Sequence, residues 1–413
     1  MKIAIIHSIY KPDTRGGAET VVQNIADGLR NRGEDIFMVS VGRKNLTETV
    51  NGIKVYRIKP FNLFNFLDIN KKPAWLRLPW HIIDMFNEIQ CWRIYKILMK
   101  ERPDVALTHN LKGLGYYTPW LLRNLKIKNI HTVHDMQLLH PSGLIKVGTG
   151  QAPAYAGQAR LVVKIYSWFC KKLFGSPGVV IFPSLYIKSV YEKYGFFPKS
   201  ERVVLGNPIV IARSSDVIVG TTKQSHRIVT ATEFIPRKKG LPRDDIFNIL
   251  FLGQVEEYKG ILELIKAVKN INGNLLLHIV GEGRALAQAK ALVAGNEKIK
   301  FYGRLSQEEI EQKIWPNIDL LINPSKTPES FGLVVVEALA HGVPAIVSSL
   351  GALPELVIEG ETGFIANGDL GQKIILCLEN QDKLKTMREK CIKESKKYDL
   401  NVYIDKIIEY ARK

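Results

Sequence analysis

Apolar runs of strand length alternate with amphipathic stretches of helical spacing along most of this chain. Residues 2–7 form one such run, and residues 18–32 carry apolar side chains at helical spacing until Gly33 ends the pattern. In α/β proteins, this alternation builds parallel sheets covered by helices. The pattern therefore predicts an α/β fold, and 413 residues are too many for one ordinary domain.

The alternation restarts after an Asn-Pro turn at residues 207–208, which we interpret as a hinge. We predict a first domain of residues 1–207 and a second of residues 208–397. Predicted strands of the first are residues 2–7, 35–41, 54–60, 104–109, 128–135, 179–183 and 202–205, with helices at 18–32, 159–174 and 186–194. Predicted strands of the second are residues 246–253, 275–280, 299–303, 319–324 and 343–347. Its helices, and those that end the chain, are predicted at 261–269, 333–341, 372–378, 383–395 and 402–412. Residues 209–245 are either extra edge strands or an ordered linker.

The stretch from residue 319 to 349 reads as strand, loop, helix and strand. Such a unit needs a right-handed crossover onto a parallel sheet, and ligands bind at the carboxyl ends of the strands in these sheets. The loop of residues 326–332 is therefore expected at the binding edge.

This loop holds one carboxylate, Glu329, and the helix after it holds another, Glu337. The amides that open the helix have no intrahelical partner and attract anions. At a rise of about 1.5 Å per residue, Glu337 lies roughly 8 Å along the helix, so the arrangement suits a nucleotide sugar. Glu329 would contact the sugar and Glu337 the ribose, with the diphosphate at Ser330, Phe331, Gly332 and Leu333. In the alternative, Glu329 is a capping-region carboxylate and Glu337 a solvated helix residue.

The string PESFGLVVVEALAHGVPAIVS, with its two Glu residues eight positions apart, resembles the donor-site signature of the retaining GT-B glycosyltransferases of family 4. The match continues through Gly351, Pro354, Glu355, Gly360 and Gly363. The resemblance implies two Rossmann-like domains facing across a cleft, with the acceptor in the first and the donor in the second. It also implies that the last helix, within residues 398–413, crosses back to pack on the first domain.

Gly16 and Gly17 precede the first predicted helix, where glycine lets backbone amides approach an anion. A Gly pair alone is usually a tight turn. The segment GGAE, however, resembles the N-terminal glycine loop of the family, which implies that Gly17 lies beside the donor phosphate and the acceptor.

His134 and Asp135 end the predicted strand 128–135, facing the binding edge. His131 and His134 are three residues apart on that strand, so they face opposite sides and do not share a metal ion. A surface His with a neighbouring Asp is the alternative. The segment HTVHD resembles the family's active-site histidine segment, which implies that His134 contacts the donor sugar and Asp135 places the acceptor. The loop of residues 141–157 is a candidate acceptor gate.

Lys259 lies in the loop after the first strand of the second domain and can reach an anion at the same edge as Glu329. A loop lysine alone is usually solvated. The family pattern adds an arginine directly after the glycine, where this chain has Gln254. Arg304 or Lys326 could replace that arginine, or donor turnover is weak.

Of the net charge of +18, +16 lies in residues 1–200, which contain 29 Lys and Arg against 13 Asp and Glu. A one-sided basic domain indicates an anionic partner such as acidic lipid, a pyrophosphate-linked acceptor or nucleic acid. Residues 61–100 interleave Phe and Trp with Lys and Arg, and their second half, from about Pro79, has helical spacing. They predict either an interfacial element at a membrane or a helix that packs on its own sheet.

The four Cys lack metal or disulfide spacing, and no apolar run could span a membrane.

The resulting expectation is a retaining transferase that moves a sugar from a nucleoside diphosphate to an acceptor hydroxyl, with Glu329, His134, Lys259 and Asp135 as catalytic residues. We expect no metal, because no DxD follows an apolar strand, and no cofactor besides the donor. The acceptor is expected to be a lipid-linked glycan of a surface polysaccharide, and the location the cytoplasm with peripheral association at the inner membrane face. The alternatives are an epimerase or phosphorylase of the same architecture, or a pseudoenzyme. No motif for reading nucleic acid is recognised, so no nucleic-acid partner is expected.

Overall fold

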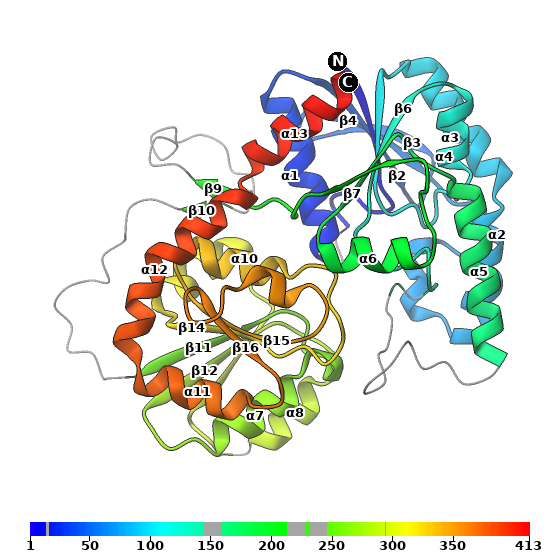
Figure 1. Cartoon of the computed structure of the whole chain (residues 1–413). Coiled ribbons are helices and arrows are strands. Elements are labelled where there is room, and N and C mark those ends of the chain that lie inside the picture. The colour runs from blue at the N-terminus through cyan, green and yellow to red at the C-terminus, as the bar shows by residue number, and fades with distance from the viewer. Residues whose placement is uncertain (14–15, 142, 144–157, 213–227, 231–245, 294) are drawn as a thin grey trace. The chain divides into compact units, whose positions relative to one another are not determined.

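The computed structural model describes residues 1–13, 16–141, 143, 158–212, 228–230, 246–293 and 295–413 (Figure 1). The chain forms two compact units, one of Met1–Pro208 with Leu400–Lys413 and one of Ile209–Asp399. We call them unit 1 and unit 2. The boundaries predicted from the sequence, after residues 207 and 397, lie close to these. The assignment of the acceptor to the first and the donor to the second stays a prediction.

Unit 1 is built on an eight-stranded sheet with the order β3-β4-β2-β1-β5-β6-β7-β8. All neighbouring strands are parallel except β3 and β4. Residues 3–6 of β1 and all four residues of β7 are apolar and buried, as expected when helices cover both faces. The strands are β1 (Lys2–Ile6), β2 (Asp35–Val41), β3 (Leu46–Val50), β4 (Ile53–Ile58), β5 (Val105–Thr108), β6 (Lys128–Thr132), β7 (Val179–Phe182) and β8 (Glu201–Val204).

The helices of unit 1 include the last helix of the chain, which packs on the first one. Ile404 lies against Gly28, where a Cβ would be only 2.8 Å from the Ile404 side chain. This confirms the predicted crossing of the C-terminal helix. The helices are α1 (Gly17–Asn31), α2 (Ala74–Met85), α3 (Glu88–Glu101), α4 (Thr118–Asn124), α5 (Gln158–Phe174), α6 (Leu185–Lys193) and α13 (Leu400–Arg412).

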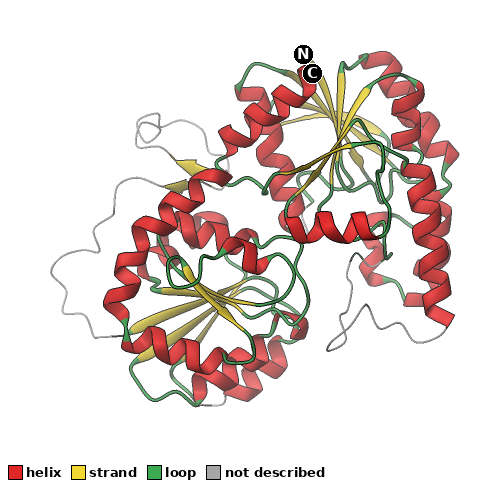
Figure 2. Ribbon diagram, in the orientation of Figure 1, coloured by secondary structure: helices red, strands yellow, loops and turns green. Residues whose placement is uncertain are grey.

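Unit 2 is built on a six-stranded, all-parallel sheet with the order β13-β12-β11-β14-β15-β16. Along β11, Ile249 and Phe251 face one apolar cluster and Leu250 faces another, so alternate side chains bury both faces. Helices lie on both sides of this sheet (Figure 2). The strands are β11 (Phe247–Leu252), β12 (Leu275–Val280), β13 (Ile299–Gly303), β14 (Leu320–Asn323), β15 (Ala345–Ser348) and β16 (Gly363–Ala366). The helices are α7 (Ile261–Lys269), α8 (Leu286–Val293), α9 (Gln307–Glu309), α10 (Leu333–Ala340), α11 (Leu370–Glu379) and α12 (Gln381–Ser395).

Both sheets reverse their strand order at one point. In unit 2 the order, counted from its first strand, is 3-2-1-4-5-6, so the reversal lies between β11 and β14. In unit 1 the reversal lies between β1 and β5. Loops at the carboxyl ends of the two flanking strands diverge at such a switch point and leave room for a ligand. The two Rossmann-like sheets predicted from the sequence are confirmed, and their switch points mark where to look for a site.

Several predicted elements have different bounds. The helix expected from about Pro79 begins at Ala74, with Pro79 inside α2, and a second helix, α3, follows. The strand expected to reach residue 135 ends at Thr132. Within residues 209–245, β9 (Val210–Ala212) and β10 (Ile228–Thr230) pair in parallel, and residues 213–227 and 231–245 lie outside the described chain. The predicted acceptor gate also lies there, except for residues 141 and 143.

In the described part of the chain, no helix is long and apolar enough to cross a bilayer. The four cysteines are free thiols, as their spacing predicts.

Candidate functional site

The loops that follow β11 and β14 lie against each other at the switch point of unit 2. A Cβ on Gly260 would lie 2.0 Å from the carbonyl oxygen of Pro324, so only glycine allows this approach. The amide of Lys326 donates to the carbonyl oxygen of Tyr258 at 2.8 Å. These backbone contacts hold the two loops together and bring their side chains to one place.

The structure brings together two of the predicted catalytic residues of unit 2. Lys259, in the first loop, places Nζ 2.8 Å from Oε1 of Glu329 in the second. Their side chains are 26% and 15% exposed, so both charges are partly reached by solvent. The pair can open toward a ligand, with the ammonium facing a phosphate and the carboxylate accepting from a sugar hydroxyl.

A third loop fixes the backbone of Glu329. After β15, the amide of Ala352 donates to the carbonyl oxygen of Glu329 at 2.9 Å. Gly351 has φ +68°, and a Cβ there would lie 2.6 Å from both N and O of Glu329. Glycine is therefore required at position 351.

Helix α10 begins at Leu333, four residues after Glu329. Its N-cap is Gly332, at φ +130°, where a Cβ would lie 2.7 Å from the side chain of Leu353. The Phe331 ring is buried and packs edge-on against Tyr398 with 5.6 Å between centroids. Phe331 therefore anchors the loop with its side chain and leaves only its backbone for a ligand. Ser330 and Leu333 are half-buried on either side of it.

Glu337 is fully buried within α10. The alternative in which Glu337 is a solvated helix residue is therefore wrong. A carboxylate with no exposed surface can meet a ribose only after its surroundings move. Its contact with a ribose stays a prediction.

The position of the expected arginine is held by an exposed glutamine. Gln254 Oε1 accepts a hydrogen bond from the Tyr258 hydroxyl at 2.9 Å. Of the two proposed replacements, Lys326 is bound to Glu263 at 2.9 Å. Arg304 follows β13, which β12 separates from β11, so it starts about 10 Å from the switch-point strand. Neither residue is well placed as the second cation.

Three buried histidines lie at the switch point of unit 1. His7 follows β1, His109 follows β5 and His134 follows β6. The exposed fractions of these residues are 0%, 1% and 6%. His109 Nδ1 lies 2.9 Å from His134 Nε2, and the two rings stack with 5.1 Å between centroids. The His7 ring stands edge-on to His109, with 5.9 Å between centroids.

Burial lowers the pKa of each of these rings, and it lowers that of His134 to about 4. All three are therefore neutral at pH 7, with one donor and one acceptor nitrogen each. Both nitrogens of His7, Nε2 of His109 and Nδ1 of His134 have no hydrogen-bond partner among the described residues. The cluster can thus offer hydrogen bonds to an uncharged polar ligand, such as a hydroxyl group.

Asp135 belongs to a polar network beside this cluster. Its Oδ1 accepts from the amide of Gln137 at 2.7 Å, and burial raises the pKa of the carboxyl group. Gln137 in turn donates to Asn110 Oδ1 at 2.6 Å. The network ties the residue after His134 to the residue after His109.

His131 is separated from His134, as expected. Its Nδ1 lies 3.0 Å from Thr108 Oγ1, and its ring packs against Phe174 in the core. Across the described residues, no three His, Cys, Asp or Glu side chains are arranged to hold a metal ion. The expectation of metal-free chemistry stays a prediction.

The glycine loop opens α1 at Gly17, and residues 14–15 before it lie outside the described chain. The amide of Gly16 donates to Oε2 of Glu19 at 2.8 Å. Glu19 therefore occupies one amide of the predicted anion cradle, and an incoming phosphate would replace it.

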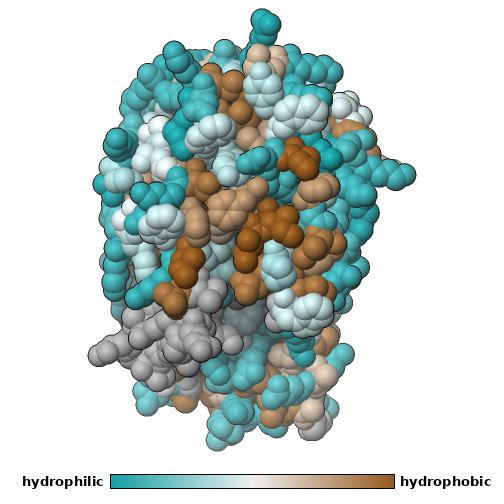
Figure 3. Space-filling view, turned by 90° about the vertical axis from the view of Figure 1, so that its right-hand side faces the viewer, coloured by the Kyte–Doolittle hydropathy of each residue, from teal (hydrophilic) through white to brown (hydrophobic). Residues whose placement is uncertain are grey.

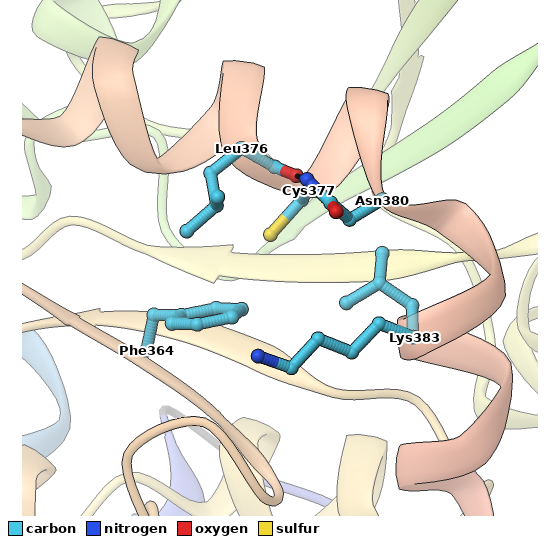
Figure 4. A pocket seen from close by; sticks show the side chains of 6 residues that line it. Phe364, Leu376, Cys377, Asn380 and Lys383 are labelled. Atoms are coloured by element: carbon cyan, nitrogen blue, oxygen red, sulfur yellow. Dashed lines mark hydrogen bonds between the residues drawn. The ribbon is translucent and has the colours of Figure 1, made fainter.

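A small pocket in unit 2 lies away from this edge (Figure 4). It has a free volume of about 40 Å³, too small for a nucleotide sugar. Helix α11 runs back from the carboxyl end of β16, so its end lies at the opposite edge of the sheet. The pocket is lined by Phe364, Leu376, Cys377, Asn380, Lys383 and Leu384.

Sequence reasoning missed His7, His109 and Asn110. The available signal was that each histidine directly follows a buried strand, as in KIAIIH and DVALTH. Polar residues at the carboxyl ends of adjacent parallel strands meet at one edge.

Two family models match the chain. Residues 15–213 match the Glycosyltransferase Family 4 model, and residues 232–398 match the model of Glycosyl transferases group 1. Together they cover most of the sequence, and the chain belongs to this family of glycosyltransferases.

Among its relatives is an uncharacterized 42.6 kDa protein in the cps region of Klebsiella pneumoniae, 25% identical over 86% of this chain and 87% of that protein. Another is the lipopolysaccharide 1,2-N-acetylglucosaminetransferase of Salmonella typhimurium, 26% identical over 50% of this chain and 53% of the enzyme.

Solved structures share the fold. Sucrose-phosphate synthase from Thermosynechococcus elongatus aligns with a TM-score of 0.68 and 17% identity, over 99% of this chain and 98% of that one. HepE from Anabaena, in complex with UDP and glucose, aligns with a TM-score of 0.66 and 18% identity, over the same shares. Both likenesses support the GT-B arrangement of two Rossmann-like domains.

Proposed function

We propose that this chain transfers a sugar, with retention at the anomeric carbon, from a nucleoside diphosphate to a hydroxyl group of a lipid-linked glycan. The donor binds at the carboxyl edge of unit 2 and the acceptor at that of unit 1. The reaction serves the synthesis of a surface polysaccharide and takes place at the inner face of the membrane, without a metal ion.

The observation that carries this proposal is the contact between Lys259 and Glu329 at the switch point, beside the first amides of α10. A departing diphosphate needs positive charge and hydrogen-bond donors, which the Lys259 ammonium and the helix amides offer. A sugar needs acceptors that orient its hydroxyl groups, which Glu329 offers. One place thus holds both groups required for the donor.

His134 and Asp135 act on the other side of the reaction. The Nδ1 atom of a neutral His134 has no partner among the described residues and can meet a hydroxyl of the sugar, and Asp135 places the acceptor hydroxyl against the anomeric carbon. As the diphosphate leaves, the sugar gains oxocarbenium character, and holding it between leaving group and acceptor supplies most of the catalysis.

The donor class and the acceptor class are supported by different comparisons. HepE was crystallised with UDP and glucose, which supports a sugar nucleotide, and the Salmonella typhimurium relative acts on lipopolysaccharide, which supports a glycan acceptor.

A thermal-shift screen of the full chain against common sugar nucleotides tests the proposal. A ligand that binds only the folded state raises the melting temperature. At a concentration of one hundred times its Kd, it adds about 2.7 kcal/mol to the free energy of unfolding. The donor found in this way should be hydrolysed slowly without acceptor and should yield a product that keeps the donor's anomeric configuration by NMR. Chelation with EDTA should leave the rate unchanged.

A pseudoenzyme is the second candidate, because Gln254 stands where the family has an arginine. Binding of a sugar nucleotide without hydrolysis or transfer would favour it. If no sugar nucleotide stabilises the chain, both readings are wrong.

A further inference from the structure

Helices α2, α3, α4 and α5 of unit 1 expose large apolar side chains. On α2, Trp75 is 73% exposed, and on α3 and α5, Trp92 and Trp168 are 54% and 51% exposed. The residues that we call the aromatic face are Trp75, Leu78, Ile82, Phe86, Ile89, Trp92, Tyr95, Met99, Trp120, Leu161, Ile165 and Trp168.

The helices that carry the aromatic face are neighbours. Helix α4 packs against both α3 and α5. The rings of Phe86, after α2, and Phe169, on α5, meet edge-on with 5.2 Å between centroids. Figure 3, which looks onto the side of Figure 1 where α2 and α5 lie, shows apolar residues gathered across this side.

The exposed apolar residues follow helical spacing. Leu161, Ile165 and Trp168 are separated by four and three positions, so they form one stripe on α5. The opposite stripe of the same helix, which includes Tyr166 and Cys170, is buried in the core. An ordinary surface helix has one apolar stripe, and here a second one faces outward. Such an exposed face marks an interaction surface.

Cations accompany the exposed rings. Lys96 Nζ lies 3.4 Å from the centroid of Trp92, and Lys172 Nζ lies 5.8 Å from that of Trp168. Helix α5 contains no acidic residue, and Glu88 is the only exposed acid on α2 and α3. The face is therefore apolar and basic at once.

We propose that the aromatic face of unit 1 docks onto a bilayer surface that contains anionic lipid. Tryptophan rings suit the depth of the headgroups, where one part of the ring is apolar and another polar. Lys96 and Lys172 are placed to meet lipid phosphates beside those rings, and the excess of +16 in residues 1–200 attracts the same surface at longer range. The sequence alone left this membrane reading and the reading as a core helix open. The structure supports both, because Trp80 is fully buried while Trp75 and Trp92 are exposed.

Docking can be measured by flotation of the full chain with vesicles of phosphatidylcholine alone and with 30% phosphatidylglycerol. We expect binding to the anionic vesicles, at least tenfold weaker in a Trp75→Ser, Trp92→Ser, Trp168→Ser variant and in a Lys96→Glu, Lys172→Glu variant.

The matched control alters the same kinds of residue on unit 2, with Ile375→Ser, Lys385→Glu and Lys390→Glu. It should bind vesicles like the unchanged chain. Equal binding by the tryptophan variant, or no binding by the unchanged chain, would overturn the proposal. So would a dimer, seen by light scattering without lipid, that the tryptophan variant dissociates, because a second copy would then cover the face. Donor binding should be the same in all variants, which separates this proposal from the proposed function.

A second inference rests on the proposed function. It concerns the positive charge that the donor diphosphate lacks because Gln254 stands where the family has an arginine. The loop after β12 lies against the loop after β11, because a Cβ on Gly283 would lie 2.2 Å from the carbonyl oxygen of Val255. The next residue is Arg284, whose amide donates to Oε1 of Glu256 at 3.1 Å. Arg284 is exposed, and its guanidinium makes no hydrogen bond or ion pair with any described residue.

Tyr258 lies beside Lys259, whose Nζ is 5.9 Å from the centroid of the Tyr258 ring. Burial raises the pKa of its hydroxyl, which Lys259 and Arg284 oppose with their positive charges. The same hydroxyl donates to Gln254. We infer that Arg284, from the adjacent strand's loop, supplies the second positive charge for the donor diphosphate.

Calorimetric titration of the full chain with UDP and with GDP tests this inference. Arg284→Ala should weaken binding of the better nucleotide about tenfold, Arg284→Lys should recover part of it, and Gln254→Arg should compensate in the Arg284→Ala background. Arg304→Ala is the control and should bind normally. If Arg284→Ala binds normally while Lys259→Ala does not, Arg284 has no such role and the proposed function stands. If the unchanged chain binds neither nucleotide, nor ADP or dTDP in the same titration, both fail.

Discussion

The carboxyl edges of the two sheets have the same architecture and opposite chemistry. At the switch point of unit 2, the side chains are charged, partly exposed and paired, as in Lys259 with Glu329. At the switch point of unit 1, they are neutral imidazoles, almost fully buried, and four of their six ring nitrogens have no partner in the described chain. A diphosphate brings charge and needs charge in return, whereas a hydroxyl needs oriented, uncharged hydrogen-bonding groups. Two sheets with the same kind of switch point thus differ in chemistry through the residues that end their strands, and the proposed function assigns the diphosphate to one edge and the hydroxyl to the other.

The largest effect should follow from breaking the charged pair. Lys259→Ala and Glu329→Ala should each lower transfer by about two to three orders of magnitude, because each removes a charge that acts on the leaving group or the sugar. The double variant should lose much less than the product of the two, since each single change strands the other charge. Steady-state rates of donor hydrolysis measure both. Full activity in Glu329→Ala would remove the donor assignment.

At the switch point of unit 1, the rate of transfer should fall by about one to two orders of magnitude when His134 loses its contact with His109. His109→Ala removes the contact at 2.9 Å to His134 Nε2, and a small misplacement of a reacting group can cost about a hundredfold. His109→Asn keeps an amide near the place of Nδ1 and should recover part of the rate. Donor affinity, measured by calorimetry, should stay unchanged in both variants. A lower donor affinity with an unchanged transfer rate would contradict the contrast between the two switch points.

The loop that holds Glu329 can be tested through its glycine. Gly351→Ala places a Cβ 2.6 Å from the backbone of Glu329, so we expect a loss of about 1–3 kcal/mol in the free energy of unfolding, together with lower activity. Gly360→Ala is the matched control, because Gly360 has a similar φ of +74° but no atom within 4 Å of its Cβ. Urea unfolding of both variants separates two costs in the free energy of unfolding. One is the clash of the new Cβ with the Glu329 backbone, and the other is the strain of a positive φ. Equal losses would show that the contact with Glu329 is unimportant.

How far the sequence predicts each edge follows from this chemistry. The unit-2 edge could be predicted because Glu329, Gly332 and Glu337 lie within one strand-loop-helix unit, so their spacing is visible in the chain. The unit-1 edge joins His7, His109 and His134 from three strands, and only the strand order makes them neighbours. The sequence also did not reveal that Glu337 is buried, because burial depends on packing from distant segments. Short or polar strands such as β3 and β16 were missed, since they lack the long apolar run that predicts a strand.

The smallest expected effect concerns pH and the buried rings. The folded state holds His7 and His109 with a pKa well below 6.5 and His134 with a pKa of about 4, whereas an unfolded histidine titrates near 6.5. Below pH 6.5 the unfolded chain therefore binds more protons, so the free energy of unfolding falls as the pH decreases toward 4 and is fully present above about 7. Each such histidine contributes a slope of up to about 1.4 kcal/mol per pH unit. His7→Leu should remove roughly one such share, because the His7 ring nitrogens have no partner to lose in the described chain. Urea unfolding at pH 7.5, 6.5 and 5.5 measures the slope. An unchanged slope in His7→Leu would mean that His7 is not held neutral in the folded state. The switch point of unit 1 would then carry charge, like that of unit 2.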